Sequence, residues 1–135
     1  MKNIFLDTNI ILDFLDKKRP LHAQSKALIS KLITEDYHIF ISEDMLSTIF
    51  YISKDKEKVL LFFETIIAKW SVVPYGLPLI SKAITSCKAN KGQDLEDTLQ
   101  CLCSKEHESI YIVTSDKRFL DCGVEVVDYD KMLKS

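Results

Sequence analysis

Short apolar runs alternate along this chain with longer amphipathic stretches. Five runs are three or four residues long and rich in β-branched residues, which is typical of strands that are covered on both faces in a parallel sheet. The predicted strands are NIFL (3–6), HIFI (38–41), SVV (71–73), IYIV (110–113) and VEVV (124–127).

The segments between these strands carry apolar residues at helical spacing. The predicted helical stripes cover residues 28–33, 45–50, 59–67, 80–87 and 95–102. Pro78 stands where a helix can begin, because proline is tolerated in a first helical turn. The alternation predicts an α/β fold with three layers, α/β/α, around a central parallel sheet of about five strands. We expect a single domain over residues 1–135.

Composition supports a globular chain. Hydrophobic residues make up 47% and charged residues 28% of 135 positions, and three glycines with three prolines leave no room for a disordered linker. The longest apolar stretches, such as VLLFFETIIA, end well short of the roughly 18 residues that a membrane span needs. The start MKNIFLD reaches a charge before a signal sequence could form its apolar segment. We expect a cytoplasmic protein that has no membrane contact.

Charge and cysteine content change this picture little. Cys87, Cys101, Cys103 and Cys122 lack the spacing of zinc ligands, so we expect reduced cysteines in the core. A net charge of −2 does not indicate the basic surface that is usual in nucleic-acid-binding proteins. Bound divalent cations would, however, reverse the sign locally.

Acidic residues follow the predicted strands or open a predicted helix. Asp7 ends the first strand and Asp116 follows the fourth, while Asp94, Glu96 and Asp97 open a late helix. The carboxyl ends of parallel strands meet at one edge of a sheet, and carboxylates gathered there would repel one another unless a cation lay among them. Mg²⁺ and Mn²⁺ prefer such oxygen ligands and can hydrolyse phosphodiesters.

Each of these acids could instead have a purely structural role. Asp7 can cap the next helix by accepting from the amide of Asn9 or Ile10, and Asp94 can form a capping box with Asp97. Asp116, or Ser115 beside it, can cap a short helix KRFL. Glu96 can be a solvated helix charge.

Three segments together resemble a PIN domain, the fold of the VapC-like toxins of bacterial toxin–antitoxin pairs and of many RNA-processing nucleases. They are FLDTNIILDFL, DLEDTLQ and IVTSDKRFL, and the similarity in order and spacing covers essentially the whole chain. The resemblance implies an endoribonuclease that uses Mg²⁺ or Mn²⁺. It assigns metal binding and catalysis to Asp7, Asp97 and Asp116. It gives supporting roles to Thr8 and Asn9 beside the first acid, and to Thr114 and Ser115 beside the last.

One position departs from the family pattern. ISEDMLSTIFYI places Thr48 where the family usually has a glutamate, so one negative charge is missing. Asp44, one helical turn earlier on the same face, is a candidate replacement, although it also suits the start of a helix that Ser42 would cap. Asp94 and Glu96 are further candidates. The departure leaves two hypotheses: a nuclease with weakened activity, or a degenerate PIN module that binds RNA or a protein without efficient cleavage.

Expectations about substrate and partners follow from the same resemblance. Arg118 is the best candidate for a phosphate contact, with Lys117 beside it, although each can be an ordinary solvated charge. Toxin-like members form homodimers and are silenced by a small antitoxin protein, and we expect both here. The helix KVLLFFETII has more apolar surface than one buried face requires, which suits an interface, although packing against neighbouring helices would explain it equally well.

Two other enzyme or signalling classes fit less well. Phosphatases of the haloacid dehalogenase type also begin with a strand-end aspartate but need a second aspartate two positions later, where this chain has Asn9. Receiver domains need paired acids at the first strand, which are missing here.

Overall fold

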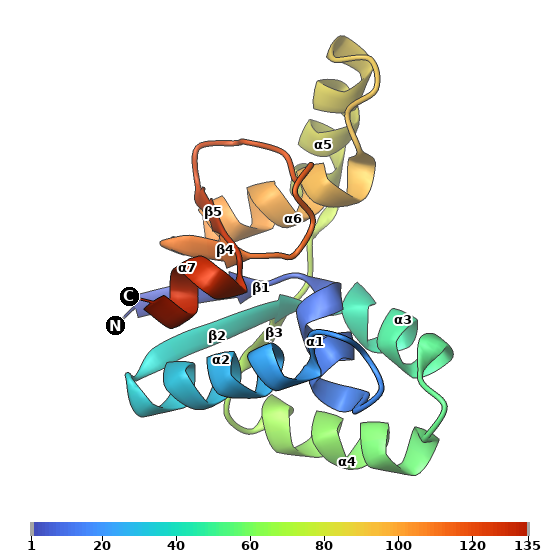
Figure 1. Cartoon of the computed structure of the whole chain (residues 1–135). Helices are drawn as coiled ribbons and strands as arrows, with labels where there is room; N and C mark the ends of the chain where they lie inside the picture. Colours follow the sequence, from blue (N-terminus) through green and yellow to red (C-terminus); the bar gives the residue numbers. More distant parts are fainter. Residues whose placement is uncertain (1, 135) are drawn as a thin grey trace.

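The computed structural model describes residues 2–134 and contains a five-stranded, all-parallel sheet (Figure 1). The strand order is β3-β2-β1-β4-β5, so the sheet predicted from the sequence is confirmed. The strands are β1 (Lys2–Leu6), β2 (Tyr37–Ser42), β3 (Ser71–Val73), β4 (Tyr111–Val113) and β5 (Glu125–Val127).

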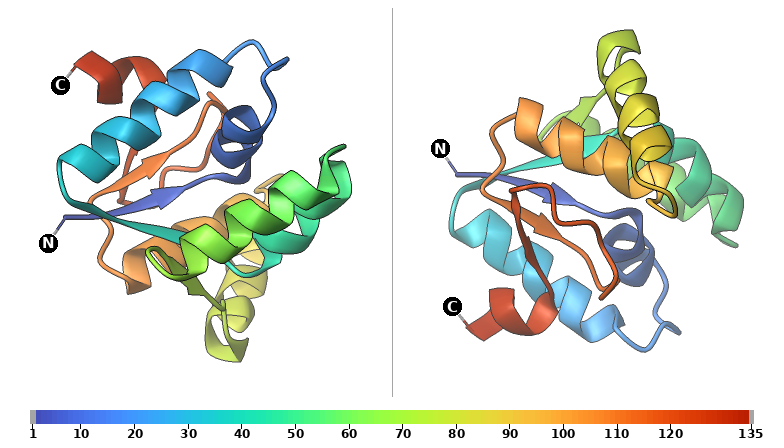
Figure 2. Two further views of the ribbon diagram at one scale, coloured as in Figure 1. Left: turned by 90° about the horizontal axis from the view of Figure 1, so that it is seen from below. Right: turned by 90° about the horizontal axis from the view of Figure 1, so that it is seen from above.

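Helices cover both faces of this sheet, which gives the predicted three layers (Figures 1 and 2). They are α1 (Thr8–Leu15), α2 (His22–Thr34), α3 (Asp44–Ile52), α4 (Lys56–Ile67), α5 (Leu77–Ala89), α6 (Leu95–Glu106) and α7 (Tyr129–Lys134). α1, α2 and α4 lie on one face, where α7 packs against α2, and α6 lies on the other with α5 beside it. Among residues 2–134, no helix is both long and apolar enough to cross a bilayer.

The core is centred on β1. Ile4, Phe5 and Leu6 have no exposed surface, and burying each such side chain contributes about 1.5–3 kcal/mol. β1 pairs with β2 on one side and β4 on the other, and the direction of the chain across the sheet reverses between β1 and β4. In open α/β sheets, ligands bind beyond the carboxyl ends of strands at such a reversal. Asp7 and Thr114 follow β1 and β4 at this place.

A buried ionic contact holds α1 against its neighbours. Asp13, which is 3% exposed, accepts from Arg19 Nε at 2.7 Å and from the Tyr129 hydroxyl at 2.7 Å. Burial raises the pKa of Tyr129, so this residue remains a hydrogen-bond donor. The contact joins α1, the loop that follows it and the start of α7.

Two local predictions are wrong. The segment KRFL forms a turn and no helix, in which Asp116 Oδ1 accepts from the Arg118 amide at 2.9 Å. Ser42 does not cap α3, because its hydroxyl lies within 3.1 Å of the Tyr75 hydroxyl in the interior. In both cases a side chain that could begin a helix makes a different hydrogen-bonding contact.

Candidate functional site

A threonine connects the two strand-end acids. The Thr114 hydroxyl donates to Asp7 Oδ2 at 2.7 Å and accepts from the Asp116 amide at 3.1 Å. The Asp7 amide donates to the Val113 carbonyl at 3.0 Å, which fixes the backbone beside β4. Asp7 is 8% and Thr114 is 3% exposed. Asp7 is therefore held in one orientation at the edge of the sheet.

Asp7 also caps α1, although with a different amide from the two expected. Its Oδ1 accepts from the Thr8 amide at 2.7 Å, while its carbonyl accepts from the Ile10 amide at 3.0 Å. The cap uses one carboxylate oxygen and Thr114 uses the other. Thr8 Oγ1 is buried and has no hydrogen-bond partner among the described residues. Asn9 is exposed at the same turn.

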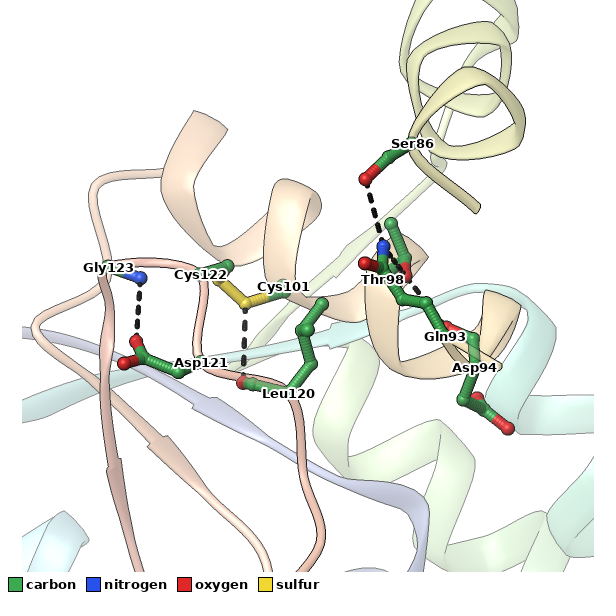
Figure 3. The surroundings of a disulfide bond; sticks show 9 residues. All are labelled: Ser86, Gln93, Asp94, Thr98, Cys101, Leu120, Asp121, Cys122 and Gly123. Carbon is green, nitrogen blue, oxygen red and sulfur yellow. Dashed lines mark hydrogen bonds between the residues drawn. A yellow bond between two sulfur atoms is a disulfide. The ribbon is translucent and has the colours of Figure 1, made fainter. Parts of the chain in front are cut away.

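The start of α6 brings a second group of acids to this edge. Asp94 caps the helix by accepting from the Asp97 amide at 2.8 Å, as the capping box predicted. Behind the cap, Gln93 Nε2 donates to the hydroxyls of Ser86 and Thr98, each at 2.9 Å, and so joins α5 to α6 (Figure 3). These contacts fix the first turn of α6, which carries Asp97.

The pKa shifts show that the acids from separate elements lie within electrostatic reach of one another. Burial, then repulsion by Asp94, Asp116, Asp7 and Glu96, raises the pKa of Asp97 to about 6. Burial, followed by the charges of Asp7, Asp44 and Asp94, also raises the pKa of Glu96. A cation placed among these carboxylates would relieve the repulsion.

The structure gives Thr48 a purely local role. Its hydroxyl donates to the Asp44 carbonyl in the same helix at 3.4 Å, and the side chain is exposed. Asp44 acts on the acidic cluster, because its charge contributes to the raised pKa of Glu96.

Sequence reasoning missed Tyr75, which follows β3. Its hydroxyl lies 3.1 Å from the Ser42 hydroxyl, and burial raises its pKa, with a smaller contribution from the charge of Asp44. Tyr75 thus joins the segment after β3 to the end of β2. The sequence signal for it was a polar aromatic residue soon after a strand, in the segment SVVPY.

A disulfide joins α6 to the loop that carries Asp116. Cys101 and Cys122 are bonded with a Cα–Cα distance of 6.1 Å, so the prediction of reduced cysteines is wrong for this pair (Figure 3). Cys87 and Cys103 are free thiols. Cys101 lies one helical turn after Asp97, and the bond therefore ties the two acid-bearing segments together.

The predicted substrate residues lie at the exposed side of this loop. Lys117 and Arg118 are exposed beside Asp116. A cavity of about 520 Å³ opens between the turn at Thr114–Lys117 and the start of α7, with Ser115 and Phe119 in its wall.

The donor chemistry suits a hard divalent cation, but the ligands are not preassembled. The carboxylates that follow β1 and β4 and that open α6 lie within electrostatic reach of one another, and the Thr8 hydroxyl, next to Asp7 in the chain, has no partner among the described residues. Within residues 2–134, however, no three His, Cys, Asp or Glu side chains are already arranged to hold one ion. Ion binding would thus require these acidic side chains to move.

Comparison with known proteins gives consistent results. Residues 4–124 match the sequence model of the PIN domain. The chain is 32% identical to ribonuclease VapC1 of Aquifex aeolicus, with 93% of this chain and 90% of that protein covered. Two solved structures share the fold. One is Mycobacterium tuberculosis VapC20, a toxin that cleaves the sarcin-ricin loop, with a TM-score of 0.72, 12% identity and coverage of 90% of this chain and 95% of that one. The other is a toxin–antitoxin complex from Klebsiella pneumoniae, with a TM-score of 0.69, 15% identity and coverage of 93% and 97%.

Proposed function

The chain belongs to the PIN-domain family, and from this premise we propose that it is a cytoplasmic endoribonuclease that depends on Mg²⁺ or Mn²⁺. The observation that carries the proposal is the crowding of acids from the end of β1, the start of α6 and the loop after β4: burial, and after it repulsion by these neighbouring carboxylates, raises the pKa of Asp97 to about 6. Such crowding is common where carboxylates share a cation or a proton, and it makes this edge the candidate active site.

Asp7, Asp97 and Asp116 would hold the ion. When bound, the ion supplies an activated water and neutralises charge on the scissile phosphate. Thr114 keeps one Asp7 oxygen oriented and also fixes the backbone at Asp116. Thr8 and Asn9 support the first acid, and Ser115 lines the neighbouring cavity.

Asp44 and Glu96 are the candidates to replace the charge missing at Thr48. Burial, followed by the charges of Asp7 and Asp44, raises the pKa of Glu96, so Asp44 and Glu96 lie within electrostatic reach of each other. Asp94 is a further candidate; one of its oxygens caps α6. Arg118, with Lys117, would bind a substrate phosphate next to the cluster.

A second candidate function is a module that binds RNA or a protein without efficient cleavage. The observation that favours it is the hydroxyl of Thr48, which faces its own helix and brings no charge to the site. Loss of one group around a metal site commonly costs 10- to 100-fold in affinity or activity, which is enough to silence a weak nuclease.

Labelled RNA incubated with the protein and Mn²⁺ separates the two functions. We expect cleavage by the wild type, none in EDTA, and none by Asp7→Asn or Asp97→Asn. Glu106→Gln, at the exposed far end of α6, is the matched control for losing one acid and should cleave normally. RNA that binds but stays intact at every Mn²⁺ concentration would establish the binding module instead.

We further propose a small antitoxin partner and a homodimer. The first rests on the resemblance in fold to the Klebsiella pneumoniae toxin–antitoxin complex. The second rests on α4, where Leu60, Leu61 and Ile67 are 50%, 66% and 61% exposed. Sedimentation of a monomer at micromolar concentration would refute the dimer. Co-purification with the product of an adjacent short reading frame would test the antitoxin.

A further inference from the structure

A cleft of about 320 Å³ lies at the far end of α1 from Asp7. The end of α1 and the loop at residues 16–19 line one side, and the connection between α3 and α4 lines the other. The views in Figures 1 and 2 place this loop and this connection on the same side of the molecule. None of the proposed metal ligands lines the cleft.

The cleft is basic, although the whole chain has a net charge of −2. Its lining has five basic side chains and two acidic ones, above a floor of Leu12, Leu15, Ile52 and Val59. Both acids are engaged in local turns: Asp16 Oδ1 accepts from the Lys18 amide at 2.9 Å, and Asp55 Oδ1 accepts from the Lys58 amide at 3.1 Å.

Two of the basic side chains, Arg19 and Lys58, make contacts that hold the sides of the cleft in place. Arg19 is paired with buried Asp13 at 2.7 Å, and Lys58 Nζ donates to the Leu15 carbonyl at 3.0 Å. Lys56, just outside the cleft, donates to the carbonyls of Phe50 and Ser53 at the end of α3. The loop and the helix connection are therefore held in place without using the remaining ammonium groups.

The remaining three lysines are free to contact a ligand. Lys17, Lys18 and Lys54 are exposed, and none of their ammonium groups forms an ion pair within the described part of the chain. Three such cations around one fixed cleft attract an anionic ligand. The lining contains no aromatic side chain on which a base could stack, so the contact would be with a backbone of phosphates.

We propose that Lys17, Lys18 and Lys54 bind the phosphodiester backbone of single-stranded RNA that continues beyond the site at Asp7. The inference rests on the proposed ribonuclease function and adds a binding site for the flanking part of the substrate. The acidic edge repels RNA, so basic groups outside it must supply the affinity. Asp7 caps the start of α1 and the cleft lies at the other end of the helix, a separation of about 12 Å for eight residues that an extended single strand can span.

Fluorescence anisotropy with a labelled single-stranded RNA tests this site in EDTA, where cleavage does not contribute. The variant combines Lys17→Ala, Lys18→Ala and Lys54→Ala in the full chain. The control combines Lys69→Ala, Lys82→Ala and Lys134→Ala, which removes the same charge from exposed positions that do not line the cleft. Binding is measured over a range of NaCl concentrations, with and without polyglutamate as competitor.

The proposal predicts that the cleft variant binds RNA at least about 10-fold more weakly than the wild type at low salt. It also predicts that the slope of log K against log salt concentration is smaller in magnitude by about 2, because each of the three lost phosphate contacts contributes about 0.7. The control should bind as the wild type does. Equal binding and slope for the two triple variants would overturn the site. So would a cleft variant that loses polyglutamate binding and keeps RNA binding, since the cleft would then serve an acidic protein segment. Absence of Mn²⁺-dependent cleavage, with cleft-dependent binding intact, would reject the nuclease and leave the binding site standing.

Discussion

Thr114 donates its hydroxyl hydrogen to Asp7 at 2.7 Å, across 107 positions of sequence. The contact joins the ends of β1 and β4 where the direction of the chain across the sheet reverses. It also leaves the Thr114 oxygen able to accept from the Asp116 amide. One small side chain therefore orients one acid and positions the backbone of another.

Thr114→Val should reduce Mn²⁺-dependent cleavage by about 10- to 100-fold, because Asp7 loses the donor that orients it. The loss of the hydrogen bond to the Asp7 carboxylate and of the one from the Asp116 amide should lower the free energy of unfolding by about 2–4 kcal/mol. Cleavage rates at saturating RNA, together with urea denaturation, measure both effects. Thr114→Ser keeps the hydroxyl and should stay near wild-type activity; a serine variant as weak as the valine variant would show that the hydrogen bond is not what matters.

Thr48→Glu should raise Mn²⁺-dependent RNase activity by about 10-fold, by restoring a carboxylate to the side of the cluster that Asp44 occupies. Thr48 is exposed, so the larger side chain meets no buried surface. Initial cleavage rates are compared with those of Thr48→Gln, which has the same shape and no charge. Equal rates for the glutamate and glutamine variants, both folded, would exclude missing charge as the limitation.

Asp97→Asn should stabilise the metal-free protein at pH 7.5. The pKa of Asp97 is raised from 3.8 to about 6 in the folded state, so between these values the folded protein binds more protons than the unfolded chain. The free energy of unfolding therefore falls as pH rises through this interval, and the asparagine variant avoids the loss. Screening by solvent reduces the gain to about 1 kcal/mol.

Melting temperatures in EDTA at several pH values test this prediction. The melting temperature of Asp97→Asn should exceed that of the wild type by a few degrees at pH 7.5, and the two should be equal near pH 4. The control Glu106→Gln should show no such dependence. Adding Mn²⁺ should stabilise the wild type more than the variant, since the ion binds only where its ligands remain. A difference in melting temperature in favour of Asp97→Asn that increases toward low pH would contradict the raised pKa of Asp97.

Reduction of the bond between Cys101 and Cys122 should lower the stability of the wild type by about 3 kcal/mol, the chain-entropy value for a loop of about 20 residues. Thermal unfolding with and without dithiothreitol measures the loss. Cys122→Ser should be insensitive to the reductant, while Cys87→Ser should respond as the wild type does. Titration of four thiols in the oxidised protein would contradict the pairing.

Much of the architecture was predictable because it depends on local pattern. The segment SVV forms β3, and the segment with helical spacing of apolar residues after Pro78 forms α5. Both were predictable because runs of β-branched residues and helical spacing are properties of neighbouring residues in the sequence. The cap at Asp94 was predictable for the same reason. The prediction that Ser42 caps α3 was wrong because its hydroxyl contacts the hydroxyl of Tyr75, which is distant in the sequence.

The less predictable features join distant segments. Cysteine spacing carries no information about which pair meets, so the bond between α6 and the Asp116 loop could not be foreseen. The influence of Asp44 on Glu96 likewise depends on how α3 and α6 lie about the sheet. The placement of Asp7 and Asp116 after β1 and β4 was predictable, since parallel strands bring their carboxyl ends to one edge.

A crystal structure of the protein soaked in Mn²⁺ tests the central claim most directly. The account predicts an ion at the edge of the sheet in contact with Asp7, Asp97 and Asp116, with Asp44 or Glu96 near it and Thr114 still bonded to Asp7. An ion bound elsewhere, or an edge without an ion at saturating Mn²⁺ and near-neutral pH, would contradict it.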